Sequence, residues 1–420
     1  MTISGHSFVA VVCAITVVLS GCVAGAAPEG PRSERRAYTI EQATSDRAQL
    51  HTIAFSAFAF ETGSLGADSF FPPGKVADWW GFQYLRDNDP SERGHNTDFL
   101  SKAALNMLHV LTPDQRARLV MLAHSQVGLI EQYALDRFPL MDAFRRLRVG
   151  ELPDGATGLD MDAVKAYSAQ LYRLDGRMSL ERAQVMGGLL HELDAEQRAY
   201  LDGLVGTGML EWPQVEEALD RRSLPHDVHV AVMTYAGDMF SWYAGSLEAD
   251  VYFCPERHGT YFGGFYLKDA PAMGNRDYTI SSTLTGNAGE QFLEKLTPEQ
   301  ARLITDIIEA QRPALEGIVE TRREVAEELR RFMAGEDADA ERVMDLCEQY
   351  GELDGELVWR YATAFAAVGQ SLSDAQRAEF AQMRTEVLGD FTPEGAFAYS
   401  RPIAMPQIPD TDFLFGGSRQ

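Results

Sequence analysis

The sequence is short of cysteine and of positive charge, and its N-terminal apolar run is brief. Four of its 420 residues are cysteine, and 37 Lys and Arg oppose 62 Asp and Glu, which gives a formal net charge of −25. Such an acidic surface repels nucleic acid, so we expect no nucleic-acid partner. The apolar run over residues 8–19 is about twelve residues long, whereas a membrane-spanning helix needs roughly 20.

Familiar catalytic motifs are also missing. The sequence has no Gly-x-Ser-x-Gly, no Gly-rich phosphate loop, no His-Glu-x-x-His and no haem-attachment motif. The one Glu-x-x-His, Glu92 to His95, lies in a polar stretch and not on a predicted helix. Asp68 and Asp250 recur at equivalent positions, but a turn or cap role explains them more simply than catalysis. We therefore predict no catalytic residues, no enzymatic activity and no cofactor, with a bound metal ion as the alternative.

The N-terminus has the pattern of an export signal. Residues 8–19 fit the apolar region of a signal peptide, and Leu19-Ser20-Gly21-Cys22 resembles the bacterial lipobox. We predict a signal peptide over residues 1–21, lipid attachment at Cys22 and a flexible tether over residues 22–37. The lipid would anchor the protein to the outer membrane, facing the periplasm or the cell surface. Cleavage after Ala26 would instead give a soluble secreted or periplasmic protein.

The rest of the sequence repeats itself. Residues 62–87 align with residues 244–269 at a constant offset of 182, without a gap. Shorter matches follow, and these pair residues 111–115 with 296–300, 174–176 with 353–355, and 193–198 with 372–377. The repeat predicts one module over residues 38–210 and a second over residues 211–388. The Pro- and Gly-rich residues 389–420 are expected to form a strap or a disordered end.

Helical periodicity predicts an all-α fold. Residues 298–333 carry apolar residues at helical spacing with charged residues in the gaps, which is typical of one long amphipathic helix. Each module is expected to begin with a helix, over residues 45–62 and 227–244. A long aromatic, Gly- and Pro-rich loop follows, and then a long helix and three shorter ones. We therefore predict two tandem modules that resemble four-helix units.

One pentapeptide pattern recurs at four predicted helix starts. Each begins with Leu, continues with a capping residue and has Gln three positions later. The pairs are Thr112 with Gln115, Asp194 with Gln197, Thr297 with Gln300, and Ser373 with Gln376. In a capping box the first side chain accepts a hydrogen bond from a free backbone N–H, and Gln returns one to the cap. This structural role accounts for all four occurrences.

The same pattern in an exported helical protein resembles the LTxxQ (Spy/CpxP-like) family of periplasmic proteins. Two of the four pentapeptides depart from the family pattern at the Thr. Members of the family are small four-helical dimers that act as ATP-independent chaperones, envelope-stress modulators or metal-responsive sensors. The resemblance implies a non-enzymatic envelope protein that binds unfolded clients, peptides or a protein partner. Two fused modules could then replace the dimer in a single chain.

The second module carries candidate metal ligands. His226, His229 and Met233 share one face of the predicted helix, and imidazole with thioether suits copper. Cys254 and His258 form a second candidate pair. The competing interpretation is that His226 caps the helix and that Cys254 is a half-cystine. Metal binding or sensing is thus the alternative function.

Two further groups complete the sequence-based hypotheses. Cys254 and Cys347 are the cysteines that remain after export and lipidation, and an oxidising compartment favours a disulfide between them. The repeated loop is the candidate ligand or partner surface, because long loops are often functional and aromatic rings make adaptable contacts. Its residues are Trp79, Trp80, Tyr84, Tyr261, Phe262 and Tyr266. The alternative is that these rings close the end of a helical bundle.

Overall fold

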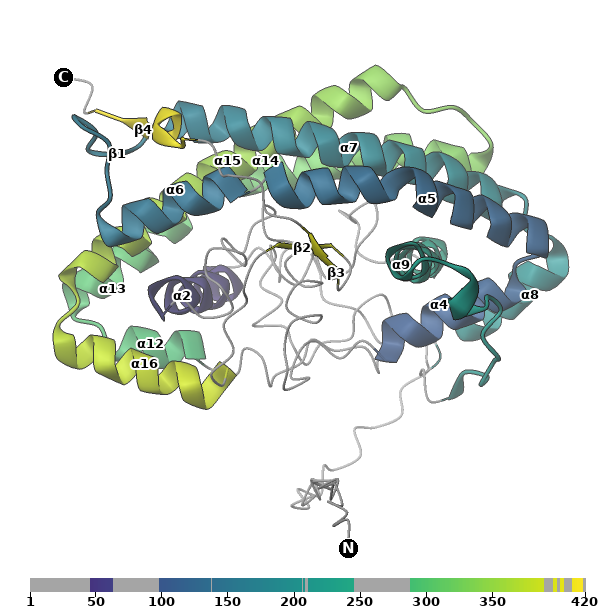
Figure 1. The fold of residues 1–420 in the computed structure, drawn as a ribbon, viewed down its shortest axis with the longest axis horizontal. Helices are drawn as coiled ribbons and strands as arrows, with labels where there is room; N and C mark the ends of the chain where they lie inside the picture. The colour runs from purple at the N-terminus through teal and green to yellow at the C-terminus, as the bar shows by residue number, and fades with distance from the viewer. Residues whose placement is uncertain are drawn as a thin grey trace, which may run out of the picture. The chain divides into compact units, whose positions relative to one another are not determined.

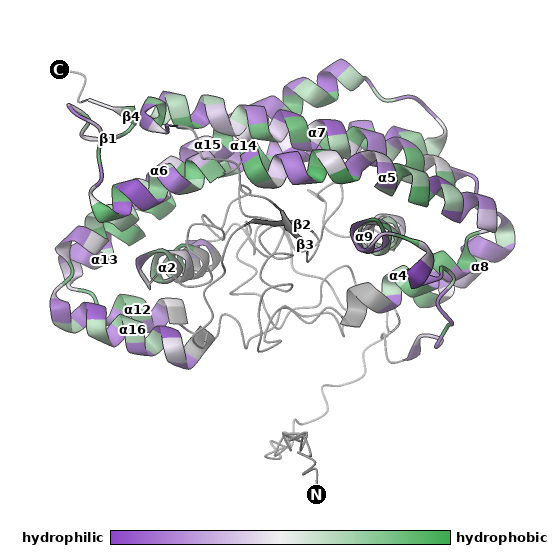
Figure 2. Cartoon of the chain, viewed as in Figure 1, coloured by the Kyte–Doolittle hydropathy of each residue, from purple (hydrophilic) through white to green (hydrophobic). Residues whose placement is uncertain are grey.

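The fold is known from a computed structural model. It describes residues 46–62, 98–136, 138–205, 207, 211–244, 288–388, 396–398, 401–403 and 410–417. The described part is mostly helical, which confirms the all-α prediction. Hydrophobic and hydrophilic residues are interleaved along the helices (Figure 2), as expected where each helix buries one face.

The helices fall into two groups along the chain. The first half contains α2 (Asp46–Thr62), α4 (Asp98–Val110), α5 (Pro113–Asp136), α6 (Phe138–Val149), α7 (Met161–His191) and α8 (Ala195–Leu204). The second half contains α9 (His226–Ala244), α12 (Ala288–Glu294), α13 (Pro298–Thr305), α14 (Ile307–Arg330), α15 (Ala340–Ser371) and α16 (Asp374–Leu388). Short 3-10 turns, η3 (Arg221–Ser223) and η4 (Arg331–Ala334), precede α9 and follow α14.

The long helix expected over residues 298–333 is divided into α13, α14 and η4. The interruption lies at Asp306, which keeps helical backbone angles, so the amphipathic stripe continues across it. The helices that follow the long helix of each module were expected to be shorter than it, and this was wrong for two of them. α7 has 31 residues and α15 has 32, which makes both longer than α14.

α7 and α15 pack against each other in antiparallel directions. Glycine residues on α15 allow the two helix backbones to approach closely. A Cβ atom added to Gly351 of α15 would lie 2.7 Å from the Cα atom of Ala169 in α7. One added to Gly355 would lie 2.6 Å from the Cα atom of Lys165. Glycine is therefore required at these two positions, where a side chain would meet the α7 backbone. This contact explains the glycine of the second of the two repeated Leu-Asp-Gly triplets.

The first helix of each half packs against helices of the other half. α2 lies against α12, α15 and α16, and Phe292 of α12 has its ring 6.0 Å from that of Phe58 in α2. α9 lies against α4, α5 and α7 in the same reciprocal manner, as the neighbouring ribbons in Figure 1 show. The described helices consequently share one hydrophobic core. The predicted module boundary near residue 210 stays a prediction.

The C-terminal tail acts as a strap where it is described. It contains β2 (Ala396–Ala398), β3 (Arg401–Ile403), η5 (Asp412–Leu414) and β4 (Phe415–Gly416). β2 pairs with β3, and β4 pairs in antiparallel fashion with β1 (Gly158–Leu159) of the first half. Leu414 is fully buried, and Arg146 of α6 forms an ion pair of 2.8 Å with Asp412. These contacts hold the tail over the end of α6.

No helix in the described ranges combines the length and the hydropathy that crossing a membrane requires. The predicted signal peptide, the lipid site at Cys22 and the tether over residues 22–37 lie outside the described residues.

Candidate binding groove along helix α15

All four repeated pentapeptides form reciprocal hydrogen bonds at helix starts. The Gln115 backbone N–H donates to Thr112 Oγ1 (3.2 Å), and the Thr112 N–H donates to Gln115 Oε1 (2.9 Å). The same two bonds occur at Asp194 with Gln197, at Thr297 with Gln300, and at Ser373 with Gln376. Each pair satisfies backbone donors that a helix start leaves open.

The glutamines also join the pentapeptides in pairs. In the first half Gln197 Nε2 donates to Gln115 Oε1 at 2.8 Å, and in the second half Gln376 Nε2 donates to Gln300 Oε1 at 2.8 Å. Gln376 Nε2 also donates to the Lys295 backbone oxygen at 3.1 Å. The motif therefore fastens two helix starts to each other, and the capping interpretation alone did not anticipate this link.

The candidate metal ligands on α9 lie in different environments. His226 is exposed, Met233 is partly buried, and His229 is buried with its Nε2 atom 2.8 Å from Glu217 Oε1. Among the described residues, no group of three or more His, Cys, Asp or Glu side chains could hold a metal ion. Cys254 and His258 lie outside the described residues, so a metal site that includes them stays a prediction.

Two other sets of candidate residues also lie outside the described part of the chain. They are the six aromatic residues, Trp79, Trp80, Tyr84, Tyr261, Phe262 and Tyr266, together with Cys254 of the predicted disulfide. Cys347 is described and is fully buried in α15 against Gly176 of α7. Its pairing with Cys254 stays a prediction.

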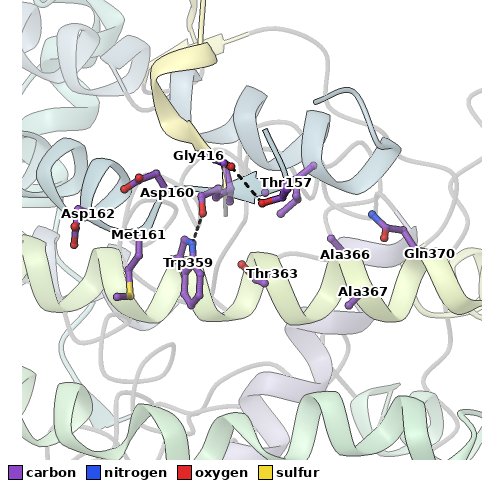
Figure 3. Close-up of a pocket in the computed structure, with 14 residues that line it drawn as sticks. Thr157, Asp160, Met161, Asp162, Trp359, Thr363, Ala366, Ala367, Gln370 and Gly416 are labelled. Atoms are coloured by element: carbon purple, nitrogen blue, oxygen red, sulfur yellow. Dashed lines mark hydrogen bonds between the residues drawn. The ribbon is translucent and has the colours of Figure 1, made fainter. Parts of the chain in front are cut away.

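The described residues line an open cavity that sequence reasoning missed. It has a volume of about 500 Å³ and lies between the β1–β4 ribbon and α15. Its lining side chains on α15 follow one helix face (Figure 3), and they are Trp359, Thr363, Ala366, Ala367 and Gln370. Spacings of three and four residues place these positions in one row. A second cavity of about 440 Å³ also has Gln370 in its lining, so the two cavities adjoin there, and together they are called the α15 groove.

A hydrogen bond from the Trp359 side chain to the β1 backbone fixes one wall of the α15 groove. Trp359 Nε1 donates a hydrogen bond of 2.9 Å to the Leu159 carbonyl of β1 (Figure 3), which holds the indole in place. Thr363 and Ala367 are exposed, whereas Ala366 is buried. The floor between Trp359 and Gln370 is thus built from the small side chains of Thr363, Ala366 and Ala367, and it is partly open to solvent.

The far end of the α15 groove carries charge from three helices. Glu61 projects from the last turn of α2, Arg148 comes from α6, and Arg377 comes from α16. Gly369 allows this arrangement, because a Cβ atom there would collide with the Glu61 carboxyl group. Within the described chain, Glu61 Oε1 is buried and has no hydrogen-bond partner. We call this the Glu61 end.

Burial has the largest effect on the pKa of Glu61. Loss of hydration raises the pKa of its carboxyl group to about 8, although Arg148, Arg377 and the Gly369 backbone act in the lowering direction. The group is therefore mostly protonated at neutral pH. Arg148 also donates to the Phe60 carbonyl at 2.9 Å, and Arg377 donates to the Gly369 carbonyl. These bonds hold both guanidinium groups at the end of the groove.

The corresponding place in the first half is arranged differently. Arg198 matches Arg377 in the repeat, and it donates to the Leu190 carbonyl at 2.8 Å as Arg377 does to Gly369. Tyr243 matches Glu61 there, but its hydroxyl group donates to Asp202 Oδ1 at 2.6 Å. The polar group at this position is thus satisfied internally where Tyr243 of α9 meets α8, while Glu61 Oε1 of α2 is left available near Arg377 of α16.

The chain was compared with family profiles, curated proteins and solved structures. Residues 290–384 match the profile described as LTXXQ motif family protein. This finding confirms the resemblance suggested by the pentapeptides, over the segment that the profile covers. The matched segment includes all of α15 and Arg377. No curated protein and no solved structure matched the chain.

Proposed function

We propose that the protein is a non-enzymatic envelope lipoprotein that binds unfolded protein segments or a peptide partner. The observation that carries this proposal is the α15 groove, whose α15 side, from Trp359 to Gln370, lies within the segment matched to the LTXXQ family. Its combined cavities of about 500 and 440 Å³ suit a ligand larger than a metal ion, because ligand pockets usually measure about 300–1,000 Å³.

The proposal includes two copies of one LTxxQ helical unit within the chain, and the reciprocal packing of α2 and α9 supports it. In this arrangement each first helix completes the bundle of the other copy, as happens when two identical protomers exchange an element. The lipid at Cys22 would tether the protein to the outer membrane. The aromatic segments that follow α2 and α9 in the sequence would add contact surface for a client.

The dimensions of the α15 groove fit an extended segment of about five residues. Trp359 and Gln370 are eleven positions apart on one helix, which corresponds to roughly 16 Å at about 1.5 Å per residue. An extended chain advances about 3.3 Å per residue. The small side chains of Ala366 and Ala367 leave room for the side chains of such a segment.

Light scattering by a reduced model client, the insulin B chain, tests this proposal. The full chain in detergent micelles is expected to suppress aggregation without ATP, whereas matched empty micelles should not. Thr363→Trp fills the groove from an exposed position and should lose most of the suppression. Glu352→Trp, also exposed on α15 but outside the groove, is the control and should retain it. Equal suppression by both variants would reject the α15 groove as the client site.

A further inference from the structure

The Glu61 end of the α15 groove has the chemistry of a ligand-binding subsite. It combines a cavity, two guanidinium groups and a buried carboxyl oxygen without a hydrogen-bond partner among the described residues. A buried polar atom without a hydrogen-bond partner destabilises the fold, and such atoms are uncommon in native proteins. A bound ligand would remove this cost.

We propose that the Glu61 end binds the C-terminal carboxylate of a peptide that lies in the α15 groove. Arg148 and Arg377 would donate to the carboxylate oxygens, in the charge-assisted geometry that guanidinium groups provide. Glu61 would share a proton with one of those oxygens. This inference rests on the proposed function and names the ligand class of the same site.

The charges along the α15 groove give the peptide a direction. Asp160 and Asp162 line it beside Trp359, and Figure 3 shows them at the end opposite Gln370. Beyond Gln370 lie Arg148 and Arg377. An extended peptide carries positive charge at its amino end and negative charge at its carboxyl end. The ends of the groove therefore complement a peptide whose last residue lies next to Gln370.

The Glu61 carboxyl group should make binding of the peptide carboxylate depend on pH. The charged groups that act on Glu61 are Arg148 on α6 and Arg377 on α16, and the Gly369 backbone of α15 faces it as well. Because the pKa of Glu61 is raised to about 8, its carboxyl group can donate a hydrogen bond to a peptide carboxylate below that pH. Above it, Glu61 is an anion that repels the ligand. Glu61→Gln keeps a donor at every pH.

The test compares two probes on the full chain in detergent. Both are fluorescein-labelled Gly-Ala-Val-Leu-Ala peptides, one with a free carboxylate and one with a C-terminal amide, and fluorescence anisotropy measures their Kd. We expect the acid to bind at least about tenfold more tightly at pH 6.5, which corresponds to the loss of one charge-assisted contact. Wild type should lose this preference at pH 9.5, and Glu61→Gln should keep it.

Two arginine variants separate the subsite from general stability. Arg377→Ala removes the guanidinium group from the Glu61 end and should abolish the preference for the acid. Arg198→Ala removes the matching bonds of the first half and should leave the preference unchanged. A preference that survives Arg377→Ala would overturn the inference.

The remaining outcomes are also decisive. Equal affinities for acid and amide would overturn the inference and leave the proposed function intact. Failure of both peptides to bind would reject the proposed function itself. Glutarate is included as a competitor at the peptide concentration. If it displaces the acid peptide equally well, the carboxylate site serves small acids, and the assignment to a peptide C-terminus is wrong.

Discussion

Replacing Glu61 by Gln should make the protein more stable at high pH. The pKa of Glu61 rises from 4.5 to about 8 on folding, mainly because the carboxyl group is buried. Between these values the unfolded chain has lost the proton that the folded chain keeps. The free energy of unfolding therefore falls as pH rises from about 4.5 to 8, and the slope is at most about 1.4 kcal/mol per pH unit.

The size of the effect follows from the same pKa values. Over the whole window the loss has an upper bound of roughly 5 kcal/mol, and it is complete above pH 8. Gln is neutral at every pH, so Glu61→Gln should show no such loss. Its advantage over wild type should be smallest near pH 4.5 and largest near pH 9.

Urea denaturation followed by circular dichroism between pH 4.5 and 9 measures this difference. Glu352→Gln removes one negative charge from an exposed position on α15 and controls for the change in net charge. The reasoning is refuted if Glu61→Gln and wild type lose stability in parallel with pH. It is also refuted if Glu61→Gln is the less stable protein at pH 9, because Glu61 would then stabilise the fold as an ion-paired carboxylate.

Three further changes test the fold and the anchor. Gly351→Ala should destabilise the protein by about 1–3 kcal/mol, since its Cβ atom would meet the α7 backbone. Gly128→Ala, in open space on α5, should be neutral or stabilising in the same urea titration. Gln376→Ala removes the acceptor of the Ser373 N–H and the bond to Gln300 and should cost about 1–3 kcal/mol, against under about 0.5 for exposed Gln382→Ala. Cys22→Ser should move the protein from the membrane pellet to the soluble fraction; unchanged fractionation would reject lipid anchoring.

Local structure could be predicted well from the sequence. The helix starts at Thr112, Asp194, Thr297 and Ser373 follow from short-range hydrogen bonding, which depends on residues three positions apart. The first helices were expected over residues 45–62 and 227–244, and they occur at Asp46–Thr62 and His226–Ala244. Helical periodicity was sufficient because each helix buries one continuous stripe.

The partners of each helix could not be predicted in the same way. The apolar stripe of α2 shows which face of the helix is buried. It does not determine whether that face packs within its own half or against α12 and α15 of the other half, as the structure has it. The α15 groove was missed for a related reason, since its walls come from β1, the tail strand β4 and α15, which are far apart in sequence. One signal was available in the repeat alignment, where Glu61 replaces the tyrosine found at Tyr243.

The location of a bound peptide tests the central claim most directly. The peptide is the free-carboxylate pentapeptide with a benzophenone amino acid at its second position. After irradiation with the full chain, digestion and mass spectrometry identify the attached fragments. The α15 groove predicts attachment within residues 359–370, suppressed by Thr363→Trp and unaffected by Glu352→Trp. Attachment that avoids residues 359–370 would contradict it, above all if it concentrates in residues 63–97 and 245–287.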